Sequence, residues 1–207
     1  MSVGALRHTL FLYASDGELG ERMAGFLEGG LDEGDVAAVV ATPPHRELLE
    51  DALGAASDEV VFFDPRGHYA RPEAALAGYD ATLRRMVAEG ARGVRMFAEM
   101  PFDFRDESLP RHRWMAYEAI FNRAFAHHPL WIACGFDERT TPEPVVDDLL
   151  RAHPEVIEHG APRPCEHYAD ASEIVRTLAP EPVPLPDLPE LELGLASDPR
   201  RLRGLLA

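Results

Sequence analysis

The first apolar stretch of the chain reads His8-Thr9-Leu10-Phe11-Leu12-Tyr13. Four similar stretches follow it, at residues 35–42, 59–64, 94–99 and 131–137. Strands that are buried on both faces of a sheet read as near-continuous apolar runs, so each stretch predicts an internal strand. Together the five stretches indicate one sheet with other elements packed on both of its faces, and this determines the fold class.

Segments with helical spacing of apolar residues separate these strands. Ser15 or Asp16 can cap the first helix, which is expected to run to about Leu31. Alternating strands and helices with short connections favour parallel strands joined by right-handed crossovers. We therefore predict an α/β fold, a doubly wound and mostly parallel sheet with helices on both faces. The further helices are expected at about residues 43–54, 71–90, 110–125 and 142–152.

The composition changes after the last of these helices. Residues 163–178 predict a short helix, and residues 179–189 hold five prolines among acidic residues, which is typical of a stiff linker. The final segment reads as a strand and a capped helix start, either the beginning of another domain or a tail that docks on this domain or on a second subunit. We predict a domain over residues 1–162, a helix and linker over 163–190, and a C-terminal tail over 191–207.

Charge excludes some classes of partner. The chain has 20 basic and 36 acidic residues, a net charge of −16. Such a surface repels phosphate backbones, so we expect no direct binding to nucleic acid. The N-terminus lacks the pattern of a signal peptide, and no apolar run reaches the roughly 20 residues that span a bilayer. With two free cysteines, Cys134 and Cys165, a cytoplasmic protein without membrane contact is expected.

The loop after the first strand lacks a phosphate-binding motif. It reads Tyr13-Ala14-Ser15-Asp16-Gly17-Glu18, without a glycine-rich run and without lysine. A phosphate loop needs both, because backbone N–H groups and an ammonium wrap the phosphates. The two acidic residues would repel phosphate. ATP hydrolysis by this route is not expected.

Polar residues end most of the predicted strands. In open parallel sheets, ligands bind just beyond the carboxyl ends of the strands. We expect these residues to gather along one rim: Tyr13, Thr42, Asp64, Glu99 and Asp137. The carboxylates of Glu99 and Asp137 can bind a cation, act as acid and base, or hold a polar ligand group. They can also simply cap loop amides, and Arg95, on the same strand face as Glu99, would then neutralise a buried acid.

The helix predicted over residues 110–125 carries a second group of candidates. Trp114 and Tyr117 belong to an aromatic stripe, which is most often core. Glu118 and Asn122 are four residues apart and share a helix face. With the aromatic residues they either line a pocket for a small, largely apolar ligand or form an ordinary surface hydrogen bond.

Three further residues raise the question of a metal. His8, Cys134 and His153 are metal-ligating residue types, but no two of them have the short spacing of a zinc motif. A lone histidine at a strand start is often a hydrogen-bonded core residue and otherwise contacts a ligand. A buried cysteine is usually a small hydrophobe. We expect no metal site and no cofactor.

Several segments, taken in order, resemble one family. They are residues 8–13, 26–35, 94–99, 114–122, 134–137 and 153–154. This set resembles the MEDS sensory domain, named for methanogen and methylotroph regulators, over about residues 5–160. The resemblance implies a RecA- or KaiC-like sheet that has lost its phosphate loop. It also implies sensing of small molecules, with hydrocarbon derivatives as proposed ligands, and fusion to output modules of the histidine-kinase or anti-sigma class.

The resemblance also implies a ligand-binding set. The residues that match the family's recurrent positions are His8, Tyr13, Arg95, Glu99, Trp114, Glu118, Asn122, Cys134 and Asp137. We add Ser15 and Tyr117 to this predicted set. The sequence departs from the family at Phe136, where relatives often carry tyrosine, so a hydrogen bond there is in doubt. The chain ends before any ATP-binding residues, and kinase activity is not carried over.

Three functional hypotheses follow. The first is a non-catalytic sensory module that binds a small molecule at the strand rim. It would signal to a regulatory partner or a fused output domain, and it can form a homodimer. The second is an enzyme that uses Glu99 with His8 or Asp137 for acid–base chemistry. The third is a scaffolding protein without a ligand.

Overall fold

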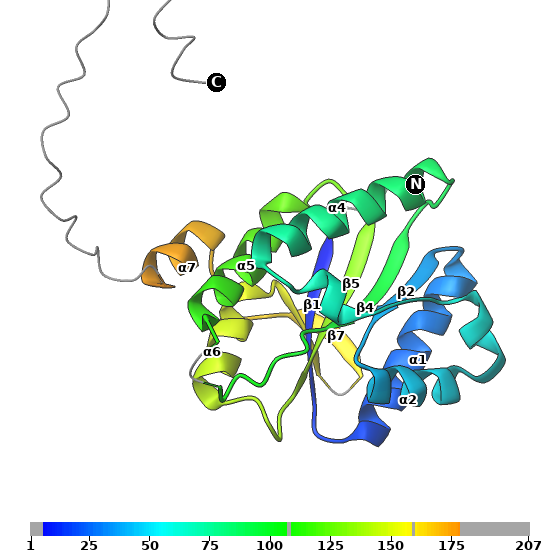
Figure 1. Ribbon diagram of the computed structural model, residues 1–207, viewed down its shortest axis with the longest axis horizontal. Helices are drawn as coiled ribbons and strands as arrows, with labels where there is room; N and C mark the ends of the chain where they lie inside the picture. The colour runs from blue at the N-terminus through cyan, green and yellow to red at the C-terminus, as the bar shows by residue number, and fades with distance from the viewer. Residues whose placement is uncertain (1–5, 107–108, 159, 179–207) are drawn as a thin grey trace, which may run out of the picture.

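The five predicted strands form one parallel array in the computed structural model, which describes residues 6–106, 109–158 and 160–178. They are β1 (Arg7–Tyr13), β2 (Val36–Val40), β3 (Val61–Phe63), β4 (Val94–Glu99) and β5 (Leu130–Asp137). The full sheet has seven strands in the order β3-β2-β4-β5-β1-β6-β7. Figure 1 shows this sheet with its flanking helices, and the predicted α/β class is confirmed.

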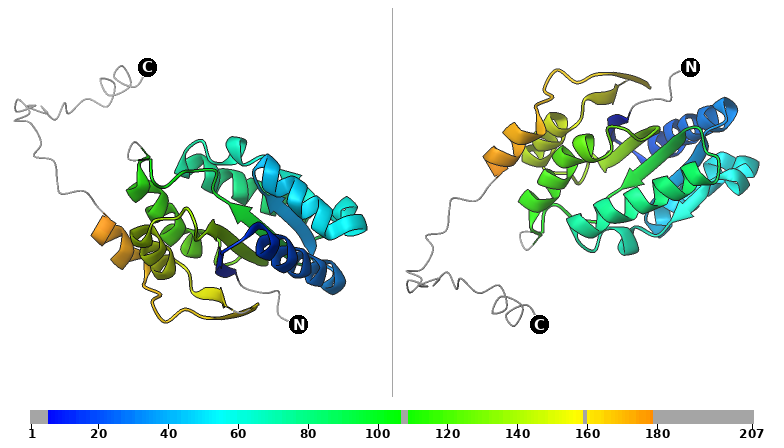
Figure 2. Two further views of the ribbon diagram at one scale, coloured as in Figure 1. Left: turned by 90° about the horizontal axis from the view of Figure 1, so that it is seen from below. Right: turned by 90° about the horizontal axis from the view of Figure 1, so that it is seen from above.

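Helices cover both faces of the sheet (Figures 1 and 2). Helices α1 (Asp16–Glu33) and α2 (Pro43–Leu53) pack on one face, where Leu19 of α1 and Leu49 of α2 are fully buried. Among the described helices, none is both long and apolar enough to cross a membrane. The opposite face carries α4 (Pro72–Ala88), α5 (Arg111–Ala124) and α6 (Glu143–Ala152).

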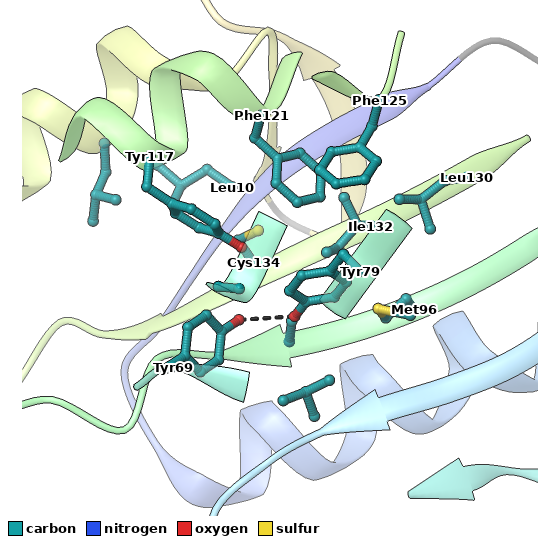
Figure 3. Packing of buried hydrophobic residues seen from close by; sticks show 14 of the residues in the cluster. Leu10, Tyr69, Tyr79, Met96, Tyr117, Phe121, Phe125, Leu130, Ile132 and Cys134 are labelled. Atoms are coloured by element: carbon teal, nitrogen blue, oxygen red, sulfur yellow. Dashed lines mark hydrogen bonds between the residues drawn. The ribbon is translucent and has the colours of Figure 1, made fainter. Parts of the chain in front are cut away.

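An aromatic layer fills the space between the second face and its helices (Figure 3). Tyr79, Phe121 and Phe125 are almost completely buried there. The hydroxyls of Tyr69 and Tyr79 lie 2.8 Å apart and share a hydrogen bond, which satisfies two polar groups inside the core. The 3₁₀ helix η1 (Gly54–Glu59) and the single turn α3 (Pro65–His68) join the predicted elements.

The chain after α6 differs from the prediction. Residues expected to begin a helix at 163 instead complete a hairpin of β6 (Glu155–Glu158) and β7 (Ala161–Pro164). Strand β6 lies parallel to β1, and the chain reverses at Gly160 with a φ of 86°. The two prolines of β7 are tolerated because the strand is at the edge of the sheet. The predicted helix begins later, as α7 (Ala171–Leu178).

Helix α7 packs on α5 and α6 through buried Ala171 and Ile174 (Figure 1). Strand β7 crosses residue 162, where we predicted the end of the first domain. The predicted proline-rich linker at 179–189 and the predicted tail at 191–207 lie outside the described residues.

The contact between α1 and β4 depends on a glycine. A Cβ atom at Gly30 would lie 2.7 Å from the Cβ of Arg95, which is closer than real Cβ contacts. Nothing lies within 4 Å of the corresponding position at Gly25, which is exposed on the same helix. The two glycines therefore have different roles in one helix.

We predict that Gly30→Ala lowers the free energy of unfolding by about 1–3 kcal/mol, because the helix must move away from the sheet. The matched variant Gly25→Ala should raise it by up to about 1 kcal/mol, since alanine favours the helix over glycine. Urea unfolding followed by circular dichroism measures both. Equal effects of the two substitutions would show that the close packing at Gly30 does not matter.

Candidate functional site

A pocket of about 310 Å³ lies at the carboxyl ends of the parallel strands. Tyr13, Glu99 and Asp137, at the ends of β1, β4 and β5, line it together with Thr42 after β2. Asp64, the fifth residue that we expected at this rim, lies outside the pocket. Its carboxylate caps α3 by accepting a hydrogen bond from the backbone N–H of Arg66.

Glu99 is held by groups from the first turn of α2. One carboxylate oxygen accepts the backbone N–H of Thr42, and the other contacts Nδ1 of His45 at 2.5 Å. The N-terminus of a helix also favours a negative charge. The hydrogen bond to Glu99 raises the pKa of His45 above its ordinary value of 6.5. Both oxygens of this buried carboxylate are thus paired, and Glu99 is part of the pocket lining.

Asp137 forms an ion pair with Arg139. The side chain of Arg139 binds both oxygens of Asp137 at 2.8 Å and also pairs with Asp16. These hydrogen bonds lower the pKa of Asp137. Tyr13 is buried beside both acids, and burial together with the charge of Glu99 raises the pKa of its phenol. Tyr13 therefore stays neutral, with a hydroxyl for hydrogen bonding.

Aromatic side chains form the other wall of the pocket. Phe102 and Phe104 come from the loop after β4, and Phe136 comes from β5. All six residues from Met100 to Arg105 of this loop line the pocket. Trp114 lies behind the wall, with its ring 4.6 Å from that of Phe102. It is core that supports the wall.

Ser15 has a structural position. It is the N-cap of α1, and its hydroxyl accepts the backbone N–H of Glu18. The Glu18 carboxylate in turn accepts the backbone N–H of Ala14. In this reciprocal cap the two backbone N–H groups are therefore bonded within the protein, whereas in a phosphate-binding loop the backbone N–H groups bind the phosphates of a ligand.

Arg95 lies far from Glu99, at the opposite end of β4. Its guanidinium pairs with Glu33 at 2.7 Å and with Asp35 at 3.2 Å, and it lies over the ring of Trp131. The idea that it neutralises Glu99 is therefore wrong. Four residues along a strand span roughly 13 Å, which is too far for an ion pair between neighbours on the same face.

The other predicted residues form a separate cluster on the second face of the sheet. His8 contacts Asn122, Cys134 and Glu118 at 3.1, 3.3 and 3.4 Å. His153 lies 3.5 Å from Glu118. Burial lowers the pKa of His8 to about 4 and that of His153 to about 3, and it raises that of Glu118 to about 7.

Tyr117 belongs to the aromatic layer beside this cluster, as Figure 3 shows next to Cys134. The eleven candidates predicted from the sequence as one set are divided in the structure. Three line the rim pocket, four form the internal cluster, and the others cap, brace or fill the core.

His45 is the important pocket residue that the sequence analysis missed. It follows Thr42-Pro43-Pro44, at the start of the helix that the sequence predicts over about residues 43–54. A side chain in the first turn of a helix after a parallel strand points toward the rim where ligands bind. That position was the available signal.

These features define a class of protein, a parallel α/β domain with a pocket at the carboxyl edge of its sheet and no phosphate loop after β1. The chain belongs to the MEDS family, described as the methanogen/methylotroph, DcmR sensory domain, whose sequence model matches residues 7–154. The resemblance stated from the sequence is thereby confirmed, and a sensory role is consistent with it. A search of curated proteins found no match to the chain.

The His45–Glu99 pair should make stability depend on pH in a defined direction. A raised pKa means that His45 binds its proton more tightly in the folded state than in the unfolded state. The contribution of the charged pair to the free energy of unfolding is therefore complete below pH 6.5, and it is lost as the pH rises through the folded pKa. We expect His45→Ala to destabilise the fold by about 1–2 kcal/mol at pH 6, with a smaller difference from wild type at alkaline pH. Urea titrations across this range measure the difference.

His68 provides the matched control, because burial lowers its pKa. The wild-type advantage over His68→Ala should shrink as the pH falls, opposite to the trend for His45→Ala. A His45→Ala difference that stays constant with pH would contradict the charged pair.

Proposed function

We propose that the chain is a non-catalytic sensory domain that binds a small neutral molecule in the rim pocket. The observation that carries this proposal is the pocket's own charge balance. Its charged side chains are paired within the protein: Glu99 with His45, Asp103 with Arg105, and Asp137 with Arg139. A charged ligand would have to break one of these pairs.

The lining indicates the chemistry of the ligand. Phe102, Phe104 and Phe136 give an apolar wall, and Tyr13 and Thr42 carry hydroxyls on the sheet side. A volume of about 310 Å³ is at the small end of the range for ligand sites. A compact molecule with an apolar body and one or two hydrogen-bonding groups fits this arrangement, such as an alcohol, a ketone or an amide.

The loop after β1 supports the loss of nucleotide binding. The N–H groups of Ala14 and Glu18 are occupied by the side chains of Glu18 and Ser15. We propose on this basis that the sheet is RecA- or KaiC-like, and that the reciprocal cap of α1 has replaced the phosphate-binding loop.

Helices α6 and α7 offer a route for the signal. Thr140 and Thr141 line the pocket immediately before α6, and α6 contacts α5 and α7. Helix α7 is the last described element before the C-terminal segment. We propose that an occupied pocket changes the stability of α6 and α7, and that a regulatory protein or a fused output domain reads this change.

An acid–base enzyme has one supporting observation, the His45–Glu99 pair in the pocket lining. Glu99 is only 5% exposed, however, and both of its oxygens are already paired. A general base must reach the proton that it removes, so Glu99 would first have to leave these partners. A ligand-free scaffold is disfavoured by the pocket itself.

We predict that the purified chain is stabilised in thermal-shift assays by members of a panel of small alcohols, ketones and amides, but not by AMP or inorganic phosphate. Phe104→Ala should weaken binding of the best compound about tenfold, because it removes part of the apolar wall. Isothermal titration calorimetry measures the change in affinity.

Phe62→Ala is the matched control, since Phe62 is also a half-buried phenylalanine but lies outside the pocket. Its affinity for the compound should equal that of the wild type. Stabilisation by AMP, or equal losses in both variants, would argue against a neutral ligand in this pocket.

The signalling route makes a separate prediction. Hydrogen exchange should slow in the pocket loop and in α6 and α7 when the best compound is added, because the ligand contacts the residues that precede α6. The 3₁₀ helix η1 is the internal reference and should not change. Protection confined to the pocket, with α6 and α7 unaffected, would refute this route while leaving ligand binding intact.

A further inference from the structure

Four buried side chains with metal-binding atoms meet inside the molecule, away from the rim pocket. They are His8 of β1, Glu118 of α5, Cys134 of β5 and His153, which follows α6. One ligand atom from each lies within 4.8 Å of all the others. The four residues are at most 6% exposed. Their long spacing in the sequence predicts no metal site, but the fold brings the four residues together.

Three of the distances between these atoms fit a tetrahedral ion. Zn²⁺ holds nitrogen, oxygen and sulfur at about 2.0–2.3 Å, which separates neighbouring tetrahedral ligand atoms by about 3.3–3.8 Å. Nε2 of His8 lies 3.3 Å from Sγ of Cys134 and 3.4 Å from Oε2 of Glu118. Nε2 of His153 lies 3.5 Å from the same glutamate oxygen.

Outer hydrogen bonds aim the histidine lone pairs at the centre of the cluster. Nδ1 of His153 lies 2.8 Å from the carbonyl of Leu149, which can only accept, so Nδ1 carries the proton. The amide nitrogen of Asn122 donates to the carbonyl of Ala152, which leaves its oxygen to accept from Nδ1 of His8. Both Nε2 atoms therefore carry lone pairs. Histidines that ligate metals are commonly fixed in this way.

The protein alone leaves part of the cluster without partners. Oε2 of Glu118 and Nε2 of His153 are buried and have no hydrogen bond within the described residues. Unpaired buried polar groups are rare in folded proteins, so such a pair calls for an explanation. A cation at the centre would satisfy both atoms at once.

We propose that His8, Glu118, Cys134 and His153 form a structural Zn²⁺ site that joins α5 and the end of α6 to the centre of the sheet. A thiolate and a carboxylate neutralise the two positive charges of the ion, which suits a site closed to water. Four protein ligands and no open position are typical of structural rather than catalytic zinc. Asn122 is a positioning residue that acts through His8.

The burial of the site determines how it must be tested. An ion cannot reach closed ligands in the folded chain, so it must enter during folding. The untagged full chain is therefore unfolded in denaturant with a chelator, freed of metal, and refolded with Zn²⁺ or Co²⁺. We expect about one equivalent of zinc per chain by elemental analysis, and a tetrahedral cobalt spectrum with a thiolate charge-transfer band.

Two cysteine variants separate this site from other thiols. Cys134→Ala should lose the thiolate band and at least nine-tenths of the bound metal. Cys165→Ala should keep both, because Cys165 is also buried but its thiol donates to the carbonyl of Leu150. Should Cys134→Ala not fold, Glu118→Gln serves instead, and it is expected to weaken cobalt binding at least tenfold while the thiolate band remains.

The wild-type chain alone can overturn the proposal. Refolding to the native circular dichroism spectrum with less than about a tenth of an equivalent of zinc, and without a cobalt–thiolate band, would exclude the site. Loss of the band in Cys165→Ala with retention in Cys134→Ala would exclude it as well.

Discussion

Burial of the central strands on both faces is the constraint on which the rest of the structure depends. All six residues of β4 are buried, although two of them, Arg95 and Glu99, are charged. Each charge lies at an end of the strand, where the neighbouring loops and helices supply partners. Buried charges are tolerated only when they are paired, so both charges of this strand lie near its ends.

Strand β5 connects the two regions of interest. Cys134 points to the face that holds the aromatic layer and the histidines, and Asp137 ends the strand at the rim pocket. Gly135 lies between them, and a side chain there would overlap the buried ring of Phe97. Only a few residues along one strand thus separate the internal cluster from the ligand pocket.

The sequence was a good guide to everything set by local pattern. The five central strands, their parallel direction and four of the five expected rim residues followed from apolar runs and from the alternation with helices. Local sequence patterns could not reveal which side chains come into contact when distant parts of the chain fold together. Arg95 meets Glu33 rather than Glu99, and His153 reaches His8 across 145 positions of sequence. The hairpin of β6 and β7 was missed because each strand has only four residues and β7 contains two prolines.

The pocket wall at residues 100–105 belongs to a loop without regular secondary structure, and the opposite wall belongs to the sheet. Substitutions in the loop alter the shape of the pocket without touching the ladder of strands. Loops accept such changes far more readily than the elements that they connect. Ligand specificity can therefore change through substitutions in this loop, with little effect on the stability of the domain.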